Sequence, residues 1–156
     1  MSTKAILALD LGTTTGFAMQ YGEGQRTSGW WSFKPQRFEG GGMRYLRFRQ
    51  KLDWMHANGD IDQVYFEEVR GHKGVDAAHV YGGLLAVLTA WCEEHAIPYL
   101  GVPVGTIKRH ATGSGNASKM EMMKAATRKA WAFDNDDECD ALWLLDYVLC
   151  MQEASV

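Results

Sequence analysis

Cysteine is scarce in this chain of 156 residues, which contains three: Cys92, Cys139 and Cys150. No two of them form a C-x-x-C pair, and neither a second cysteine nor a close histidine supplies the spacing of a zinc motif. An odd number of unpaired cysteines is typical of free thiols in a reducing compartment. We therefore expect no zinc site built on the cysteines.

Long apolar stretches are also missing. No run approaches the roughly 18 residues of a membrane span, and residues 1–4 lead into a strand-like segment without the parts of a signal peptide. No repeat or linker divides the chain. With 46% hydrophobic and 22% charged residues, the sequence predicts one domain, residues 1–156, in the cytoplasm of the cell that makes it and without a membrane partner.

The sequence lacks the excess of positive charge that is common in nucleic-acid-binding proteins, since its formal net charge is −3. The charges are nevertheless unevenly distributed. Residues 34–51 contain one acid, Glu39, and six basic residues: Lys34, Arg37, Arg44, Arg47, Arg49 and Lys51. Residues 134–156 contain seven acids and neither lysine nor arginine. This distribution fits a metal-binding nuclease that grips phosphate elsewhere, although solvated helix faces explain the basic residues equally well.

Hydrophobic patterning predicts an α/β protein. Residues 5–9 are continuously apolar, which is typical of a central buried strand. The other expected strands cover residues 17–21, 28–33, 64–66 and 97–102. Helices are expected to begin near residues 43, 75, 104, 118 and 136, the fourth with a capping box made by Ser118 and Glu121. Three meander strands followed by helix–strand units predict a mixed five-stranded sheet flanked by helices.

Two acids, Asp10 and Glu67, come at the ends of predicted buried strands. Ligands of open α/β sheets bind at the carboxyl edge, where both acids are expected to lie. A carboxylate in such a place is costly unless it is paired or binds a metal. Taken alone, each is as compatible with capping a turn as with a functional role.

The last helix supplies two more acids. Its expected apolar stripe consists of Ala141, Leu144, Leu145, Val148 and Leu149. Asp137 lies at the N-terminal end of this stripe and Asp140 at its edge, so both are expected to face the sheet. Asp136 and Glu138 project to either side, and Asp136 is the rival to Asp137. Asp146 is expected on the opposite, solvated side.

Two carboxylates held together against a sheet repel each other, and a divalent cation removes the repulsion. Together with the strand-end acids they form an all-oxygen ligand set, which suits Mg²⁺ or Mn²⁺. Two such ions about 4 Å apart can activate water and stabilise the leaving oxygen in phosphodiester cleavage.

Several motifs together resemble the RuvC-type Holliday junction resolvases, which have the RNase H-like fold. They are Leu7–Gly12 with Gly16–Ala18, Tyr65–Val69, Val104–Lys108, Gly113–Lys119 and Asp137–Leu142. Each motif is weak alone, but their order and spacing match from residue 5 to about residue 148. The short sequence looks more similar to phage relatives than to the bacterial enzyme.

The resemblance implies a metal-dependent endonuclease that acts in DNA recombination and repair. In this sequence Asp10, Glu67, Asp137 and Asp140 match the catalytic metal ligands, with two ions and no organic cofactor. Glu68, the neighbour of Glu67, is expected to face the other way. The family nicks four-way junctions symmetrically as a homodimer.

Basic residues are expected to contact DNA. Lys108 and Lys119 match family residues that contact phosphate or support cleavage, and Lys119 lies in the first turn of a predicted helix, where N–H groups bind phosphate. The other candidates are Arg70, Lys73, Arg44 and Arg47. Arg70 stands where bacterial members carry an inserted aromatic residue, so a broader range of branched DNA is an alternative. The dimer helix follows Glu67, and its apolar residues, Tyr81, Leu84, Leu85, Leu88 and Trp91, suit core packing equally well.

Other functions compete with this interpretation. Residues 9–16 also resemble the first phosphate loop of sugar kinases and chaperone ATPases, but 156 residues leave no room for their second lobe. A same-fold nuclease for RNA–DNA hybrids and a non-cutting branched-DNA binder are further alternatives. The five histidines are scattered, and no two pair at metal-binding spacing.

Overall fold

The computed structural model describes residues 3–155. Its strands are β1 (Ile6–Asp10), β2 (Thr14–Tyr21), β3 (Gln25–Ser32), β4 (Gln63–Glu68) and β5 (Tyr99–Pro103). Its helices are α1 (Met43–Gly59), α2 (Val75–Glu94), α3 (Val104–Thr112), α4 (Lys119–Arg128) and α5 (Asp136–Ala154). Residues 1, 2 and 156 of the domain prediction lie outside the described residues.

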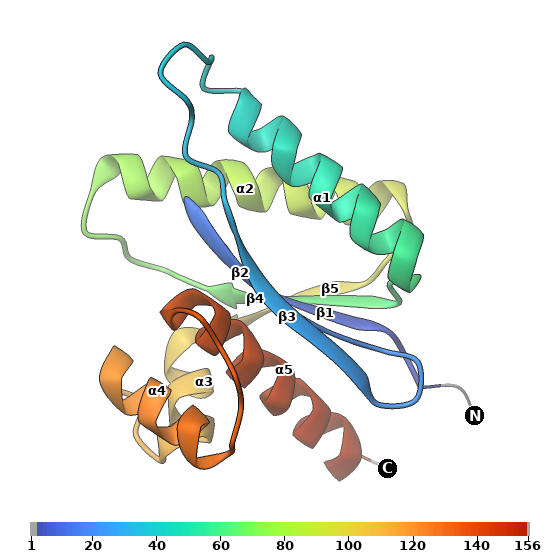
Figure 1. Ribbon diagram of the computed structural model, residues 1–156, viewed down its shortest axis with the longest axis vertical. Coiled ribbons are helices and arrows are strands. Elements are labelled where there is room, and N and C mark those ends of the chain that lie inside the picture. The colour runs from blue at the N-terminus through green and yellow to red at the C-terminus, as the bar shows by residue number, and fades with distance from the viewer. Residues whose placement is uncertain (1–2, 156) are drawn as a thin grey trace.

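The five strands form one mixed sheet in the order β3-β2-β1-β4-β5 (Figure 1). β1, β2 and β3 make an antiparallel meander, whereas β4 is parallel to β1 and β5 is parallel to β4. β1 lies in the middle because residues 6–9 are apolar on both sides and are almost fully buried. The predicted fold class is confirmed.

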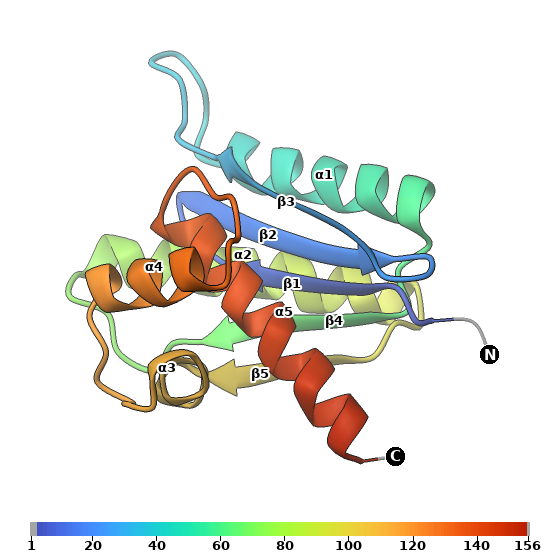
Figure 2. The ribbon, with the colours of Figure 1, turned by 60° about the horizontal axis from the view of Figure 1, so that its bottom comes forward.

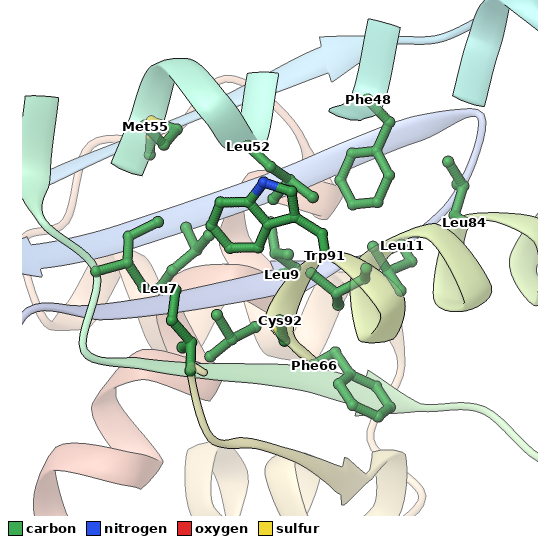
Figure 3. Packing of buried hydrophobic residues seen from close by; sticks show 14 of the residues in the cluster. Leu7, Leu9, Leu11, Phe48, Leu52, Met55, Phe66, Leu84, Trp91 and Cys92 are labelled. Atoms are coloured by element: carbon green, nitrogen blue, oxygen red, sulfur yellow. The ribbon is translucent and has the colours of Figure 1, made fainter. Parts of the chain in front are cut away.

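Helices cover both faces of the sheet. α1 and α2 pack on one face, and α5 crosses the other face with α3 and α4 beside it (Figure 2). Side chains of β1 alternate between the two layers: Leu7 and Leu9 enter the core under α1 and α2, and Ile6 and Ala8 enter the core under α5. Figure 3 shows the first core, where Trp91 of α2 packs beside Leu52 of α1.

The second core lets α5 lie close to the sheet because the side chains between them are small. Ala8 of β1 and Ala18 of β2 are fully buried in the same cluster as Ala141 of α5. This close packing holds the N-terminal turns of α5 against the middle strands. The predicted site residues of α5, Asp137 and Asp140, are therefore positioned by a rigid contact between the helix and the sheet.

Helix boundaries follow the sequence signals closely, and strand boundaries less so. The Ser118–Glu121 capping box is confirmed: the Glu121 amide donates to Ser118 Oγ at 3.2 Å, and the Ser118 amide donates to Glu121 Oε1 at 3.3 Å. β2 begins at Thr14, three residues earlier than predicted, because the turn after β1 is very tight. Thr15 Oγ1 closes that turn by donating to the Gly12 carbonyl at 2.7 Å and accepting from the Gly12 amide at 3.2 Å.

α2 is more apolar than the lack of long apolar runs in the sequence suggested. Its 20 residues are long and apolar enough to cross a membrane by length and composition. Its buried side nevertheless contributes Leu84, Leu88 and Trp91 to the core under α1 and α2. We therefore treat α2 as a layer of this fold.

Candidate active site

Asp10 and Glu67 are neighbours because of the parallel register of β1 and β4. Leu9 is paired with Phe66, so the next residue of each strand falls at the same edge of the sheet. Asp10 shares the alternation of Ile6 and Ala8, and Glu67 shares that of Tyr65, which places both side chains on the face that α5 covers. The expected meeting of the two strand-end acids is confirmed.

Glu68 faces the other way, as predicted. It shares the alternation of Val64 and Phe66, which belong to the core under α1 and α2. Its carboxylate lies 3.7 Å from the Arg70 guanidinium. The two consecutive glutamates of β4 thus occupy different chemical environments.

Gly16 lets the start of α5 reach the end of β1. It pairs with Asp10 in the antiparallel ladder. A Cβ atom at this position would lie 1.9 Å from the Asp137 carbonyl oxygen. Only glycine permits this approach of α5 to β2, and the approach carries Asp137 and Asp140 to the strand-end acids.

The four predicted acids come together at this point. Carboxylate oxygens of Asp10, Glu67 and Asp140 lie within 4.8 Å of one another. The Asp10 carboxyl lies close enough to those of Glu67 and Asp137 to share a side-chain hydrogen bond with either when one partner is protonated, and these contacts shift the pKa values of Asp10 and Asp137. β1, β4 and α5 therefore place four carboxyl groups close together.

The electrostatics of this cluster are unfavourable for four negative charges. Burial, followed by the Glu67 charge, raises the pKa of Asp10 well above its usual range. Burial, followed by the charges of Glu67, Asp136 and Asp137, raises the pKa of Asp140 to about 8. Burial and the Asp136 charge also raise the pKa of Asp137. The protein collects acids here without supplying enough positive charge to keep them ionised.

Two lysines flank the cluster. The Lys119 ammonium lies 3.1 Å from the Asp136 carboxylate, and the charges of Asp137 and Asp140 add to the rise in its pKa. The Lys108 charge acts against the rise in the pKa of Asp140 and partly lowers it. Both predicted lysines therefore lie beside the acids, and Asp136 pairs with a lysine whereas Asp137 contacts Asp10.

Glu138 is a site residue that the sequence analysis missed. It was expected to project to one side of α5, but it is buried, with 5% of its surface exposed. Ser28 Oγ donates to its Oε2 at 2.6 Å, and the Asp134 amide donates to its Oε1 at 2.9 Å. Glu138 thereby anchors the first turn of α5 to β3. The prediction was wrong because β3 lies beside this part of the helix and covers the side that was expected to face solvent.

Tyr81 of α2 supports Glu67 from the other face of the sheet. Its hydroxyl donates to the Glu67 carbonyl at 2.9 Å and accepts from the Val69 amide at 3.1 Å. These two bonds hold the end of β4 where its ladder stops. The apolar periodicity of α2 gave no signal for this role of the tyrosine hydroxyl.

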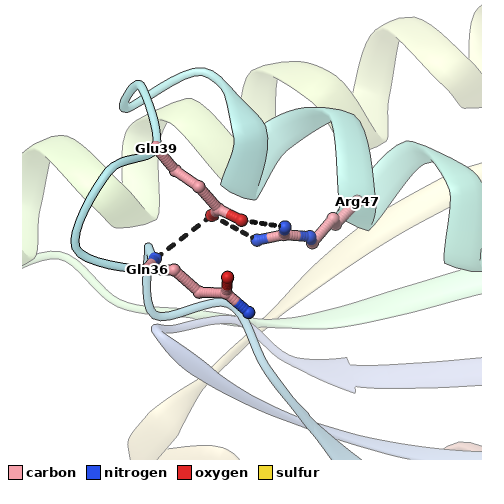
Figure 4. Close-up of polar contacts among 3 residues, drawn as sticks. All are labelled: Gln36, Glu39 and Arg47. Carbon is pink, nitrogen blue, oxygen red and sulfur yellow. Dashed lines mark hydrogen bonds and ion pairs between the residues drawn. The ribbon is translucent and has the colours of Figure 1, made fainter.

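Two other predicted DNA contacts, Arg44 and Arg47, belong to α1, which covers the sheet face opposite the acids. Arg47 binds Glu39 through two hydrogen bonds, and Glu39 also accepts from the Gln36 amide at 3.1 Å (Figure 4). The bonds from Arg47 lower the pKa of Glu39 to about 2. Arg44 lies one turn before Arg47 on α1, partly buried.

Arg70 and Lys73 lie in the loop between β4 and α2. Both are exposed, and the Arg70 side chain is 84% exposed. This loop begins two residues after Glu67, so it extends from the edge of the sheet where the acids gather.

A groove of about 840 Å³ lies elsewhere, between α1 and the β2–β3 pair. Phe17 and Trp31 stack on its wall, with their ring centroids 4.4 Å apart. Phe17 belongs to the core under α1 and α2, so the groove opens on the sheet face opposite the carboxyl cluster. It is separate from the candidate active site.

Asp146 corrects another expectation. It was predicted to be solvated, but its side chain is 13% exposed and lies 2.8 Å from His110 Nε2. α3 packs against the side of α5 that faces away from the sheet, so that side is not open to water. The prediction failed because helical periodicity identifies the side that meets the sheet but not a second helix behind it.

No model of a protein family matches the chain, and no curated protein sequence matches it either. Solved structures do match. Thermus thermophilus RuvC in complex with a Holliday junction substrate aligns over 90% of each chain with a TM-score of 0.71 and 18% identity. Another structure of Thermus thermophilus RuvC aligns over 89% of each chain, with a TM-score of 0.68 and 20% identity.

The yeast mitochondrial Holliday junction resolvase Ydc2 is also similar. It aligns over 90% of this chain and 75% of its own, with a TM-score of 0.59 and 17% identity. At these identities the likeness establishes the fold. The chain therefore has the fold of the RuvC resolvases, as the resemblance of its motifs predicted.

Proposed function

We propose that this protein is a metal-dependent endonuclease that cuts branched DNA, with the four-way Holliday junction as its main substrate. The observation that carries the proposal is the convergence of Asp10, Glu67 and Asp140 within 4.8 Å, together with Asp137 in contact with Asp10. These four residues are the proposed metal ligands and catalytic residues. Residues 1–156 are proposed to act as one domain in the cytoplasm.

The carboxyl cluster fits divalent cations. Its donors are all oxygen atoms, which Mg²⁺ and Mn²⁺ prefer. Burial, followed by the neighbouring carboxylates, raises the pKa values of Asp10 and Asp140, and a bound dication would stabilise their ionised forms. When bound, a pair of such ions supplies an activated water and stabilises the leaving oxygen. Mg²⁺ is the proposed ion, and Mn²⁺ is the alternative.

In the proposed mechanism, lysine side chains beside the carboxyl cluster position the scissile phosphate. The charges of Lys119 and Lys108 act on acids of the cluster, and both ammonium groups attract the DNA backbone. Lys119 also begins α4, whose first amides are oriented toward anions. The exposed Arg70 and Lys73 extend the positive surface, and Arg44 and Arg47 of α1 are the outermost proposed contacts.

The substrate class rests on the fold. The RuvC structure that shares this fold over 90% of both chains is a complex with Holliday junction substrate. Arg70 stands in the loop after the catalytic glutamate and offers a cation to phosphate. This difference from the aromatic residue expected there favours a broader set of branched substrates as the alternative.

A homodimer through α2 completes the proposal, since symmetric nicking needs two sites related by a two-fold axis. Only 28% of the most apolar window of α2 is buried within the chain. Ala78, Gly82, Ala86 and Ala90 recur every four residues and are all exposed, so another helix could approach closely there. The larger apolar residues Tyr81, Leu84, Leu88 and Trp91 belong to the core instead.

Light scattering tests the dimer. The wild-type protein is expected at twice the chain mass, and Ala86→Arg is expected to be monomeric because the charge would be buried at the contact. Ala154→Arg, at the exposed end of α5, is the matched control and stays dimeric. A wild-type monomer at micromolar concentration would remove the dimer but leave the cluster intact.

Cleavage of synthetic substrates tests the function. A four-way junction, a fork, a linear duplex and an RNA–DNA hybrid are each incubated with Mg²⁺ or with a chelator, using wild type and Asp140→Asn. We expect paired nicks at symmetric positions in the junction, only with the metal and only with wild type. Cutting of every branched DNA would broaden the substrate, preferential cutting of the hybrid would change it, and no cutting at all would reject the nuclease.

A further inference from the structure

A second group of ligand-type side chains lies on the outer side of α5. His110 Nε2 of α3 is 2.8 Å from Asp146 Oδ2, and Cys150 Sγ, one helical turn further along α5, is 4.0 Å from the same oxygen. Donor atoms of all three residues lie within 4.8 Å of one another. The three residues come from two helices and are separate from the four acids at the sheet edge.

The surroundings hold the histidine in place. The His110 ring lies edge-on to Trp143, with centroids 5.8 Å apart, and edge-on to Tyr147, with centroids 5.6 Å apart. Both aromatic residues are on α5, as is Asp146, so the same helix orients the ring and supplies its partner. A ligand whose ring is already oriented loses little conformational freedom when a metal binds.

We propose that His110, Asp146 and Cys150 form a binding site for Zn²⁺ or a similar transition-metal ion. One nitrogen, one oxygen and one thiolate sulfur make a borderline-soft set, which suits Zn²⁺ and does not suit Mg²⁺. Three protein ligands leave a fourth tetrahedral position for water. Cys150 is exposed, so an ion can enter from solvent.

The distances need only small adjustments. Tetrahedral Zn²⁺ with ordinary bond lengths separates its ligand atoms by about 3.3 to 3.6 Å. The histidine–aspartate contact would lengthen from 2.8 Å, and the cysteine–aspartate contact would shorten from 4.0 Å. Side-chain rotations of Asp146 and Cys150 on one helix face can make both changes.

The site would fasten α3 to α5. His110 lies two residues after Lys108, and Asp146 lies six residues after Asp140. The charge of Lys108 on α3 acts on the carboxyl group of Asp140 on α5 and opposes the rise in the pKa of Asp140. A metal bound at the second group would therefore fix the spacing of the two helices that carry this lysine and this proposed ligand, without taking part in the reaction.

Cobalt absorption tests the site directly. Reduced, untagged, metal-free protein is titrated with Co²⁺, whose thiolate complexes show a charge-transfer band in the near ultraviolet. One equivalent per chain is expected to produce the band, and one equivalent of Zn²⁺ is expected to remove it. Cys150→Ser should lose the band, and His110→Gln should weaken Co²⁺ binding at least about tenfold. Asp140→Asn is the matched control and should keep the band.

Alkylation of the wild-type thiols provides a readout that needs no variant. Cys150 is exposed, whereas Cys92 and Cys139 are buried and serve as internal references. Zn²⁺ is expected to slow modification of Cys150 at least tenfold, and Mg²⁺ is expected to leave it unchanged. A wild-type protein without the band, a band retained in Cys150→Ser, or a Cys150 that Zn²⁺ does not protect would overturn the proposal. None of these results depends on nuclease activity.

Discussion

Acids at the start and in the middle of α5 differ in what surrounds them. Asp137 and Asp140, in the first turns, have carboxyl groups of Asp10 and Glu67 as their neighbours. Asp146, in the middle of the helix, has the ring of His110 at 2.8 Å. Both groups are packed against other elements, so burial does not distinguish them. The first group has no hydrogen-bond donor comparable to His110 among the contacts described above, which is why we propose it as the cation site.

The same contrast exists within a single turn. Asp136 pairs with Lys119, and Glu138 accepts hydrogen bonds from Ser28 and from the Asp134 amide. Asp137, between them, contacts another acid. Neighbouring residues of one acidic segment thus divide into acids that pair with a base or with neutral donors, and an acid whose carboxyl group faces another carboxyl group.

Among substitutions outside the four acids, the largest effect is expected when the approach of α5 is blocked. In Gly16→Ala, the new Cβ would collide with the Asp137 backbone, so α5 must shift away from β2. A displacement of about 1 Å at a catalytic group can cost on the order of 100-fold in rate. Junction cleavage under single-turnover conditions measures the loss.

Gly105→Ala provides the control for that substitution. A Cβ atom at this position in α3 would lie at an ordinary contact distance of 3.8 Å from the Gly115 carbonyl oxygen. Cleavage by this variant should stay within about twofold of wild type, since surface changes away from special features are nearly neutral. Equal activity in Gly16→Ala and wild type would show that the close approach is unnecessary.

The pH dependence of stability sharpens the comparison. Without metal, Asp140 keeps its proton to about pH 8 in the folded protein, whereas the unfolded chain releases it near the ordinary value of 3.8. Between these values the unfolded state binds fewer protons, so the free energy of unfolding falls as pH rises. We expect a fall on the order of a few kcal/mol between pH 5 and 8.

Urea denaturation in chelator and in Mg²⁺ measures this effect. Mg²⁺ should raise the midpoint most at the high end of the range, since the ionised carboxylates then have a counterion. Asp140→Asn cannot titrate at that position, so its metal-free midpoint should change less with pH. If the urea midpoint of the metal-free wild-type protein rises with pH, Asp140 does not have the raised pKa that this account assigns to it.

Substitution of Glu138, whose carboxylate accepts two hydrogen bonds, should lower the free energy of unfolding and leave Mg²⁺ binding nearly unchanged. Glu138→Gln leaves Ser28 and the Asp134 amide with a weaker acceptor in a buried place. The expected loss is about 1 to 3 kcal/mol of unfolding free energy. Calorimetric titration with Mg²⁺ should give a dissociation constant within a few-fold of wild type at a temperature where the variant is folded. A loss of Mg²⁺ binding with unchanged stability would place Glu138 among the ligands.

The smallest effect is expected at Tyr81. Tyr81→Phe removes the hydroxyl that bridges the Glu67 carbonyl and the Val69 amide. One hydrogen bond of this kind contributes about 1 kcal/mol, so the urea midpoint should fall slightly. Junction cleavage should fall several-fold because the end of β4 becomes looser, and an unchanged rate would confine the role of the hydroxyl to stability.

The sequence predicted the layers of the fold because each layer has its own periodicity. Residues 6–9 are apolar on both faces, and the apolar stripe of α5 begins beside Asp137. The four acids could be found because strand ends and helix faces are local properties. Their convergence follows once β1 and β4 are parallel neighbours.

Other features depend on contacts between distant segments. Nothing local distinguishes Gly16 from a turn glycine, although its missing Cβ makes room for residue 137. Glu138 meets a serine 110 residues away, and Asp146 meets a histidine 36 residues away. Periodicity places a side chain on a helix face, but tertiary packing decides whether that face is covered. The burial of both acids therefore could not be read from the sequence.

The two glutamates of β4 give the most direct test of the central claim. Glu67 and Glu68 are consecutive, but they lie on opposite faces of the sheet, so Glu67→Gln and Glu68→Gln are the same chemical change in two environments. The measurement is single-turnover cleavage of a four-way junction in Mg²⁺ by both variants and by wild type. Glu67→Gln should lose on the order of 1,000-fold, as expected when several kcal/mol of metal-based stabilisation are removed. Glu68→Gln should remain within a few-fold of wild type, and equal losses in the two variants, or none in Glu67→Gln, would contradict the assignment of the site.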